Sequence, residues 1–184
     1  MKVTPLNIQD VLLIEPHVFE DSRGFFFESF REDLFRKEPS LNVSFVQDNH
    51  SKSSQGVLRG LHYQLPPHAQ GKLTRVIQGE VLDIAVDIRE SSPTCGQYVA
   101  EILSGDNKKQ LYMPEGFAHG FLTLSETSEY LYKTTDFYHP ECERCIIWDD
   151  ATLNIAWPID LNIRLSPKDL LGQSFKTSTL FSPQ

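Results

Sequence analysis

An arginine and a histidine lie three residues apart in an apolar run, Arg59-Gly60-Leu61-His62-Tyr63-Gln64. Because an imidazole titrates near neutrality, His62 could act as a general base; alternatively, it is a barrel histidine bonded to a neighbour. Residues three apart on a regular strand point to opposite faces. Arg59 and His62 therefore share a site only if the chain is irregular near Gly60, where a bulge would re-aim one of them.

Two other polar side chains could complete this chemistry. If Lys72 faces the same cavity as His62, its ammonium could stabilise an enolate oxygen; otherwise it is a solvated lysine at the start of a strand. Residues 129–138 alternate in polarity, so Tyr130 and Tyr132 should share one face. A tyrosine across a cavity from a base can act as a general acid, whereas an aromatic row can also simply support packing.

The segment Pro114-Glu115-Gly116-Phe117-Ala118-His119 has the spacing P-x-G-x-x-H. This spacing resembles the second motif of the cupin barrels, where the histidine often binds a metal. The region that would supply the first cupin motif contains His62-Tyr63-Gln64 and lacks a second histidine. Because a metal site needs three or four converging ligands, we expect a cupin barrel that has lost its metal ligands. The competing interpretation is a metal-dependent cupin.

Composition limits the partners of the chain. It has 184 residues and a formal net charge of -8, which argues against a protein that coats nucleic acid. No apolar stretch is long enough for a membrane span, and the first residues lack the pattern of a signal peptide. Three cysteines, including the C-x-x-C pair Cys142 and Cys145, suit a reducing cytoplasm better than a zinc site or a disulfide framework. We expect a cytoplasmic protein that binds neither nucleic acid nor membranes.

The elements that must position these side chains are mainly short strands. Runs of β-branched and aromatic residues alternate with turn signals such as Gln78-Gly79 and Gly105-Asp106-Asn107. Their spacing favours a sandwich or barrel in a single domain over residues 1–184. The predicted strands are Val11–Ile14, Val43–Asn49, Leu58–Gln64, Leu73–Gln78, Val81–Ile88, Gln97–Leu103, Gln110–Met113, Gly120–Leu124, Glu129–Thr135 and Cys145–Trp148.

Two short helices interrupt the strands. Ser29 and Glu32 have the spacing of a capping box for a helix that ends before Pro39. Ser166-Pro167-Lys168-Asp169 is typical of a helix start, with an N-cap serine and a proline in the first turn. Between the first two predicted strands, Arg23 precedes a run of phenylalanines, and its planar guanidinium could clamp a phosphate.

Taken in order, these motifs make the chain similar to the dTDP-4-dehydrorhamnose 3,5-epimerase family, from about residue 3 to residue 175. Several motifs in the right order are more specific than any one alone. The resemblance implies a mainly β fold, a cupin-type double-stranded β-helix (jelly-roll barrel) with a few short helices. It also implies a homodimer that uses neither a metal nor an organic cofactor. The motifs are Asp21-x-Arg23-Gly24-x-Phe26-x-Glu28, Gln47-x-Asn49, Leu58-Arg59-Gly60-Leu61-His62-Tyr63-Gln64, Gly71-Lys72, Pro114-x-Gly116-Phe117-Ala118-His119-Gly120-Phe121, Tyr132-Lys133-x-Thr135-Asp136 and Ser166-x-Lys168-Asp169.

The same resemblance implies a role for each matching residue. His62 would be the general base, oriented by Asp169, while Lys72 would stabilise the enolate. Tyr132 would return a proton on the opposite face of the sugar. Arg23 and Arg59 would bind the diphosphate, and His119 would lie beside the sugar or the phosphates. The residues that would contact the nucleotide, some of them across a dimer interface, are Phe26, Glu28, Gln47, Asn49 and Tyr138. Lys168 is also expected to bind the substrate. Asp83, near His62 or Lys72, and Glu143 are secondary candidates.

The reaction implied by the resemblance is the double epimerisation of dTDP-4-dehydro-6-deoxy-D-glucose at C3 and C5, giving dTDP-4-dehydro-L-rhamnose in dTDP-L-rhamnose biosynthesis. The 4-ketone acidifies C3–H and C5–H, so the reaction needs a base, an oxyanion stabiliser and an acid. The sequence contains no glycine-rich dinucleotide loop, which disfavours a redox route through NAD. The same motifs would also fit a single-site epimerase, a keto-sugar isomerase or a non-catalytic module that binds a sugar nucleotide.

Overall fold

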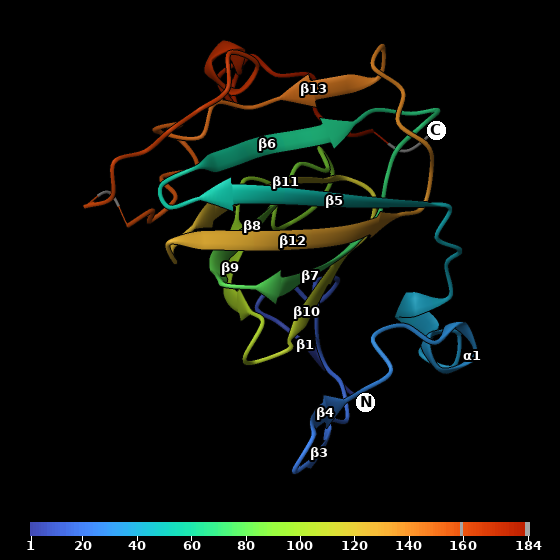
Figure 1. The fold of residues 1–184 in the computed structure, drawn as a ribbon. Coiled ribbons are helices and arrows are strands. Elements are labelled where there is room, and N and C mark those ends of the chain that lie inside the picture. Colours follow the sequence, from blue (N-terminus) through green and yellow to red (C-terminus); the bar gives the residue numbers. More distant parts are fainter. Residues whose placement is uncertain (159, 183–184) are drawn as a thin grey trace.

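Two antiparallel β-sheets face each other in the computed structural model, which describes residues 1–158 and 160–182 (Figure 1). The first sheet has the strand order β1 (Lys2–Pro5), β2 (Leu12–Glu15), β10 (Gln110–Met113), β7 (Lys72–Gln78), β12 (Thr127–Thr134) and β5 (Gln47–Ser54). The second has the order β13 (Glu143–Cys145), β6 (Leu58–Gln64), β11 (Phe117–Thr123), β8 (Glu80–Asp87) and β9 (Tyr98–Ser104). A separate hairpin joins β3 (Phe19–Asp21) to β4 (Gly24–Phe26). This is the predicted jelly-roll barrel of the cupins.

Strand β8 shows how an alternating sequence builds the core. Val81 and Ala85 belong to the cluster of buried residues between the two sheets. Ile84 and Val86 point the other way, into a second cluster that is completed by residues from the segment after β13. Both faces of this strand are therefore buried, and Asp83 lies on the inner face with no exposed surface. A carboxylate in that position needs hydrogen-bonding partners inside the barrel.

Strand β5 lies further along the chain than predicted. We expected a strand at Val43–Asn49, but the strand runs from Gln47 to Ser54. Its sequence is polar and gives a weak strand signal, and what holds it in place is a continuous antiparallel register with β12. Val43 and Phe45 instead pack against a cluster on the outside of the first sheet.

The other predicted strand boundaries match the structure in some cases and differ from it in others. Strands β6 and β10 have the predicted ends, whereas β11 begins at Phe117 rather than Gly120. Strands β1, β3 and β4 were not predicted, and β13 overlaps the predicted Cys145–Trp148 only at Cys145. Of these strands, β13 pairs with β6, which is distant in the sequence, so local sequence does not encode it. Strand β1 pairs with β2, and β3 pairs with β4, across short connections.

The predicted cap at Ser29 is wrong, whereas Ser166 does bond to the start of the C-terminal helix: its hydroxyl accepts from the N–H of Asp169, whose carboxylate accepts from the N–H of Ser166. Helix α1 (Glu32–Phe35) has Arg31 as its N-cap, without a side-chain cap; the carbonyl of Ser29 accepts a hydrogen bond from Gln110 instead. A short 3-10 helix, η1 (Pro39–Leu41), follows. The predicted C-terminal helix is only a three-residue 3-10 helix, η2 (Asp169–Leu171). Within the described residues, no helix is both long enough and apolar enough to cross a bilayer.

The predicted irregularity at Gly60 is confirmed. Gly60 has a φ of 132°, and the register between β6 and β11 shifts between His119 and Phe121. A Cβ atom at this position would lie 2.5 Å from the Cα of Gly120, so only glycine fits. The shift allows Arg59 and His62 to line the same pocket, which a regular strand would prevent.

Candidate active site

A pocket of about 450 Å³ lies in the barrel, with walls from β5, β6, β7, β11 and β12. Its volume is in the range of small-ligand sites. It brings together most of the predicted site residues, although they come from segments more than 100 residues apart in the sequence. The predicted residues that line it are Gln47, Asn49, Arg59, His62, Lys72, His119, Tyr132, Tyr138, Glu143, Lys168 and Asp169.

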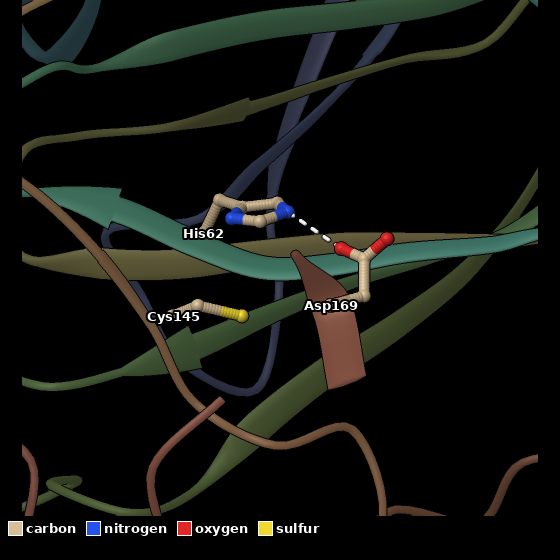
Figure 2. Close-up of side chains that lie close together, drawn as sticks. All are labelled: His62, Cys145 and Asp169. Atoms are coloured by element: carbon tan, nitrogen blue, oxygen red, sulfur yellow. Dashed lines mark hydrogen bonds and ion pairs between the residues drawn. The ribbon is translucent and has the colours of Figure 1, made fainter. Parts of the chain in front are cut away.

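The predicted pair of imidazole and carboxylate is present. His62 Nε2 lies 2.7 Å from Asp169 Oδ1 (Figure 2). Asp169 also accepts hydrogen bonds from the N–H of Gly60, at 3.1 Å, and from the Ser166 hydroxyl. Burial alone would raise the pKa of Asp169, but these hydrogen bonds outweigh it and hold the pKa well below its usual range. The ionised carboxylate accepts Nε2–H of His62 and so leaves Nδ1 with the lone pair that a base requires.

Lys72 is buried beside this pair. The residue is 6% exposed, and its Nζ donates a hydrogen bond to the backbone carbonyl of His62 at 3.1 Å. Burial lowers the pKa of Lys72 to about 8, against the opposing effect of the Glu143 and Asp83 carboxylates. At neutral pH the side chain therefore carries a desolvated positive charge, which is what an enolate oxygen requires.

Tyr132 reaches the pocket from the same sheet as Lys72, opposite the sheet that carries His62. It lies on β12, where Thr134 pairs with Lys72 and Tyr132 pairs with Thr74, so strand alternation directs Tyr132 and Thr134 to the same face. Burial raises the pKa of Tyr132, with the neighbouring Glu143 acting in the same direction. The phenol consequently keeps its proton at neutral pH and can donate it.

A second imidazole–carboxylate pair lies deeper in the barrel. His119 Nε2 is 2.7 Å from Asp83 Oδ1 and 3.1 Å from the Tyr130 hydroxyl. Tyr130 and Thr74 both donate hydrogen bonds to the other oxygen of Asp83. Burial lowers the pKa of His119, in spite of Asp83, so its ring faces the pocket in the neutral form. Asp83, a secondary candidate, does not line the pocket but supports His119 from behind.

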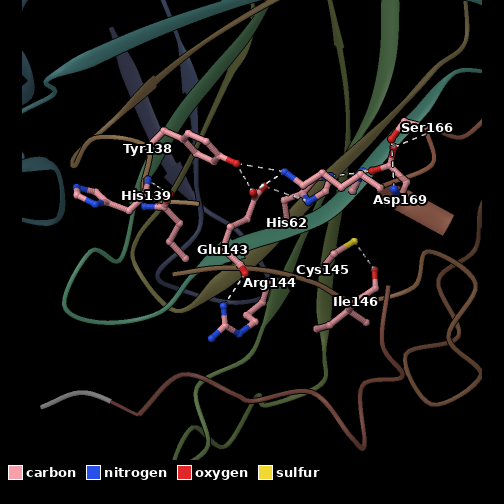
Figure 3. Close-up of polar contacts among 12 residues, drawn as sticks. His62, Tyr138, His139, Glu143, Arg144, Cys145, Ile146, Ser166 and Asp169 are labelled. Carbon is pink, nitrogen blue, oxygen red and sulfur yellow. Dashed lines mark hydrogen bonds and ion pairs between the residues drawn. The ribbon is translucent and has the colours of Figure 1, made fainter. Parts of the chain in front are cut away.

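The mouth of the pocket carries a cluster of mixed charge (Figure 3). Glu143 accepts hydrogen bonds from Tyr138, at 2.6 Å, and from Lys168. Its other carboxylate oxygen lies 3.5 Å from Nδ1 of His62. Arg59 is nearby and exposed, with its Nε donating to Ser53. Cations at the rim of a concave site suit a substrate that carries phosphates.

Arg23, Phe26 and Glu28 do not reach the pocket of their own chain. Arg23 and Phe26 lie on the β3–β4 hairpin, which projects from the barrel well away from β6 (Figure 1). Phe26 is 65% exposed, while within the part of the chain that the structure describes Arg23 and Glu28 form ion pairs only with residues near them in the sequence. Among the described residues the hairpin strands pair with each other and with no barrel strand, which is why Arg23 and Phe26 are carried away from the site.

Sequence reasoning missed several residues of the pocket wall: Ser51, Tyr63, Gln64, Gln70, Phe121, Thr134 and Ser166. Strand parity could have found some of them. Ser51 follows Gln47 and Asn49 at intervals of two, and Gln64 follows His62 in the same way. Gln64 also anchors the pocket rim, because its side chain accepts from the N–H of His139 and donates to the carbonyl of Phe137.

Known proteins are similar to this chain in sequence and in fold. The model of the dTDP-4-dehydrorhamnose 3,5-epimerase family matches residues 5–177. The chain is 57% identical to the dTDP-4-dehydrorhamnose 3,5-epimerase of Pseudomonas aeruginosa, covering 98% of this chain and 99% of the relative. It resembles the dTDP-6-deoxy-D-glucose-3,5-epimerase of Legionella pneumophila, solved with dTDP-4-keto-L-rhamnose, with a TM-score of 0.94, 46% identity and coverage of 100% of this chain and 98% of that one.

A more distant solved structure is a 3'-monoepimerase from Streptomyces bikiniensis, in complex with dTDP-quinovose. Its TM-score is 0.88 at 32% identity, covering 94% of this chain and 87% of that one. The similarity of the barrel thus extends to enzymes named for epimerisation at a single carbon.

The barrel and its pocket define an isomerase of the cupin type, with acid and base side chains arranged around one cavity. Within that class, the chain belongs to the dTDP-4-dehydrorhamnose 3,5-epimerase family.

Proposed function

We propose that the protein epimerises dTDP-4-dehydro-6-deoxy-D-glucose at C3 and C5, giving dTDP-4-dehydro-L-rhamnose for dTDP-L-rhamnose biosynthesis. The observation that carries this proposal is the convergence of His62, Lys72 and Tyr132 on one pocket. The identity to 3,5-epimerases, 57% against 32% to the monoepimerase, supports action at both carbons. Incubation with the keto sugar followed by NMR of the product tests the proposal; an unchanged sugar, or a product inverted at one carbon, would refute it.

The proposed chemistry consists of two cycles of deprotonation and reprotonation. Nδ1 of His62 removes the proton next to the 4-ketone, and Asp169 stabilises the imidazolium that forms. The electron pair moves onto the ketone oxygen, where the Lys72 ammonium stabilises the enolate. Tyr132 then supplies a proton from the other face, which inverts the carbon. Arg59, Lys168 and His119 bind the phosphates or the sugar, and the remote binding energy orients the ring.

The role of Lys72 predicts an alkaline limit to activity. Because burial lowers the pKa of Lys72 to about 8 in the free protein, kcat/KM should fall as the pH rises through that value and the ammonium is lost. An ordinary lysine, with a pKa of 10.5, would leave kcat/KM constant there. The fold should not weaken in the same range, because a lysine whose pKa is lowered on folding makes stability rise with pH between the two values. A pH profile of kcat/KM alongside thermal unfolding checks both statements.

Tyr132→Phe separates proton removal from proton return. The variant keeps the ring but loses the hydroxyl, so His62 should still exchange a substrate proton while inversion slows by about 10²-fold or more. Deuterium incorporation from D₂O, compared with product formation in the same sample, measures the two steps. Tyr138→Phe, which removes a hydroxyl at the pocket mouth, is the matched control. Equal loss of exchange and inversion in Tyr132→Phe would contradict the assignment.

We further propose that the protein works as a homodimer in which the β3–β4 hairpin completes the partner's pocket. Phe19, Phe25 and Phe26 expose 57%, 58% and 65% of their surface on this small hairpin, an apolar group that favours burial against another chain. Two-fold pairing with a second copy would bury it. Arg23, Phe26 and Glu28 would then contact the nucleotide across the interface.

Mixing two defective variants tests the shared site. His62→Ala removes the base from the pocket, and Arg23→Ala removes the hairpin cation, which should lower kcat/KM by about tenfold or more. If each site combines both chains, a mixed dimer has one intact site, so random mixing should restore about a quarter of the wild-type activity. Co-refolding at equal concentration and assaying below KM measures this recovery. Activity no greater than the mean of the two variants would refute the shared site.

We also propose that the protein is a single domain over residues 1–184, that it acts in the cytoplasm, and that it binds neither nucleic acid nor membranes. The three cysteines are free, as a reducing compartment favours, and the net charge of -8 disfavours polyanionic partners.

A further inference from the structure

Cys145 lies directly behind the proposed base. Strands β13 and β6 are antiparallel, and Cys145 pairs with His62 across them. Residues directly opposite each other in such a pair project to the same face of the sheet. Glu143, two residues earlier, projects to that face as well and lines the pocket. A thiol is therefore placed beside the imidazole, although none of the proposed proton transfers uses it (Figure 2).

Three different ligand atoms converge at this position. A ring nitrogen of His62, Sγ of Cys145 and a carboxylate oxygen of Asp169 all lie within 4.8 Å of one another. Nitrogen, sulfur and oxygen atoms are the donors of zinc sites, and three such ligands leave one coordination position open. A hard cation such as Mg²⁺ prefers oxygen ligands only, so the thiol selects for a borderline or soft ion.

A bound divalent cation lowers the pKa of a thiol that coordinates it, so Cys145 would lose its proton as the ion binds.

We propose that His62, Cys145 and Asp169 form an inhibitory site for a thiophilic divalent cation such as Zn²⁺. On binding, the S–H bond of Cys145 breaks and its proton passes to solvent as the S–Zn bond forms. His62 binds the ion through Nε2 and moves its ring proton to Nδ1, next to Glu143. No electron transfer is involved. The ion replaces the hydrogen bond between His62 and Asp169 and leaves the base without a free lone pair.

The inhibition rests on the proposed function, whereas the binding does not, so the two are measured separately. Competition with a chromophoric zinc chelator measures binding to the wild-type protein and to Cys145→Ser. Turnover at buffered free Zn²⁺ measures inhibition in the same two proteins. Cys145→Ser keeps a small polar side chain and should leave zinc-free turnover unchanged. Loss of one of three ligands should weaken both binding and inhibition by at least about tenfold.

A second group of three ligands provides the matched control. His68, Asp136 and His139 also lie within 4.8 Å of one another, at the loop that carries Tyr138. His139→Ala should leave Zn²⁺ inhibition as in the wild type, and Mg²⁺ should not inhibit. Equal Zn²⁺ affinity and inhibition in the wild type and Cys145→Ser, or inhibition abolished by His139→Ala, would overturn the proposal. If the wild type shows no turnover without zinc, the proposed function fails, but chelator competition still tests the site.

Discussion

Replacing His62 with alanine is expected to lower kcat by about 10²–10⁴-fold, the contribution of a positioned general base. The structure gives the physical reason. Asp169 fixes the ring by accepting Nε2–H at 2.7 Å, and the other ring nitrogen has no hydrogen-bond partner among the described residues. If this nitrogen serves both carbons, deuterium exchange from D₂O should be lost at C3 and at C5 alike. Steady-state kinetics and NMR exchange measure the two effects.

The control for this experiment is another histidine of the barrel. His50 lies on β5 with its side chain half exposed, 3.4 Å from Glu129, and does not line the pocket. His50→Ala should retain nearly full activity. Circular dichroism of His62→Ala should resemble the wild type, because the His62 side chain is 24% exposed and is no part of the main core. The unfolding temperature should fall, because buried Asp169 loses the hydrogen bond that most lowers its pKa. A folded His62→Ala protein with wild-type turnover would exclude His62 as the base.

Replacing Lys72 with methionine should lower kcat by about 10²–10³-fold, the loss expected when an oxyanion donor is removed. Methionine has a similar length and no charge. The fold should therefore keep or gain stability, because a buried ammonium is costly to desolvate. The fall in activity above pH 8 should also vanish with the titrating group. Lys52→Met, at an exposed position on β5 paired with Glu129, is the control.

Low or unchanged turnover of Lys72→Met can each be distinguished from misfolding, because the stability of the same variant is measured. A stable Lys72→Met protein with low kcat and a flat alkaline profile supports electrostatic stabilisation of the enolate. A stable variant whose kcat stays within about twofold of the wild type would show that the enolate does not need an oxyanion donor of this strength.

Much of the barrel could be predicted because its inner strands carry strong local signals. Strand β6 is apolar throughout except for Arg59, His62 and Gln64, and its ends were predicted to the residue. The parity argument at Gly60 was also sound, since φ and the register shift both depart from a regular strand there. Where side-chain alternation and turn residues agree, local sequence is sufficient to place a strand.

Features that depend on distant contacts could not be predicted in this way. Strand β5 is polar and becomes a strand through its pairing with β12, so the sequence placed it too early. The partnership of Asp83 with His119 and Tyr130 joins three strands, and nothing local to Asp83 indicates it. The position of Arg23 and Phe26 outside their own pocket is equally invisible to motifs, which record order along the chain and not which chain supplies a residue.

The central claim is that one pocket removes and returns protons at both carbons that flank the 4-ketone. Its most direct test is turnover of dTDP-4-dehydro-6-deoxy-D-glucose in D₂O by the wild-type protein, with the deuterium located by NMR. We predict solvent deuterium at both C3 and C5 of the inverted product. Label at a single carbon, or inversion without any label, would contradict this account.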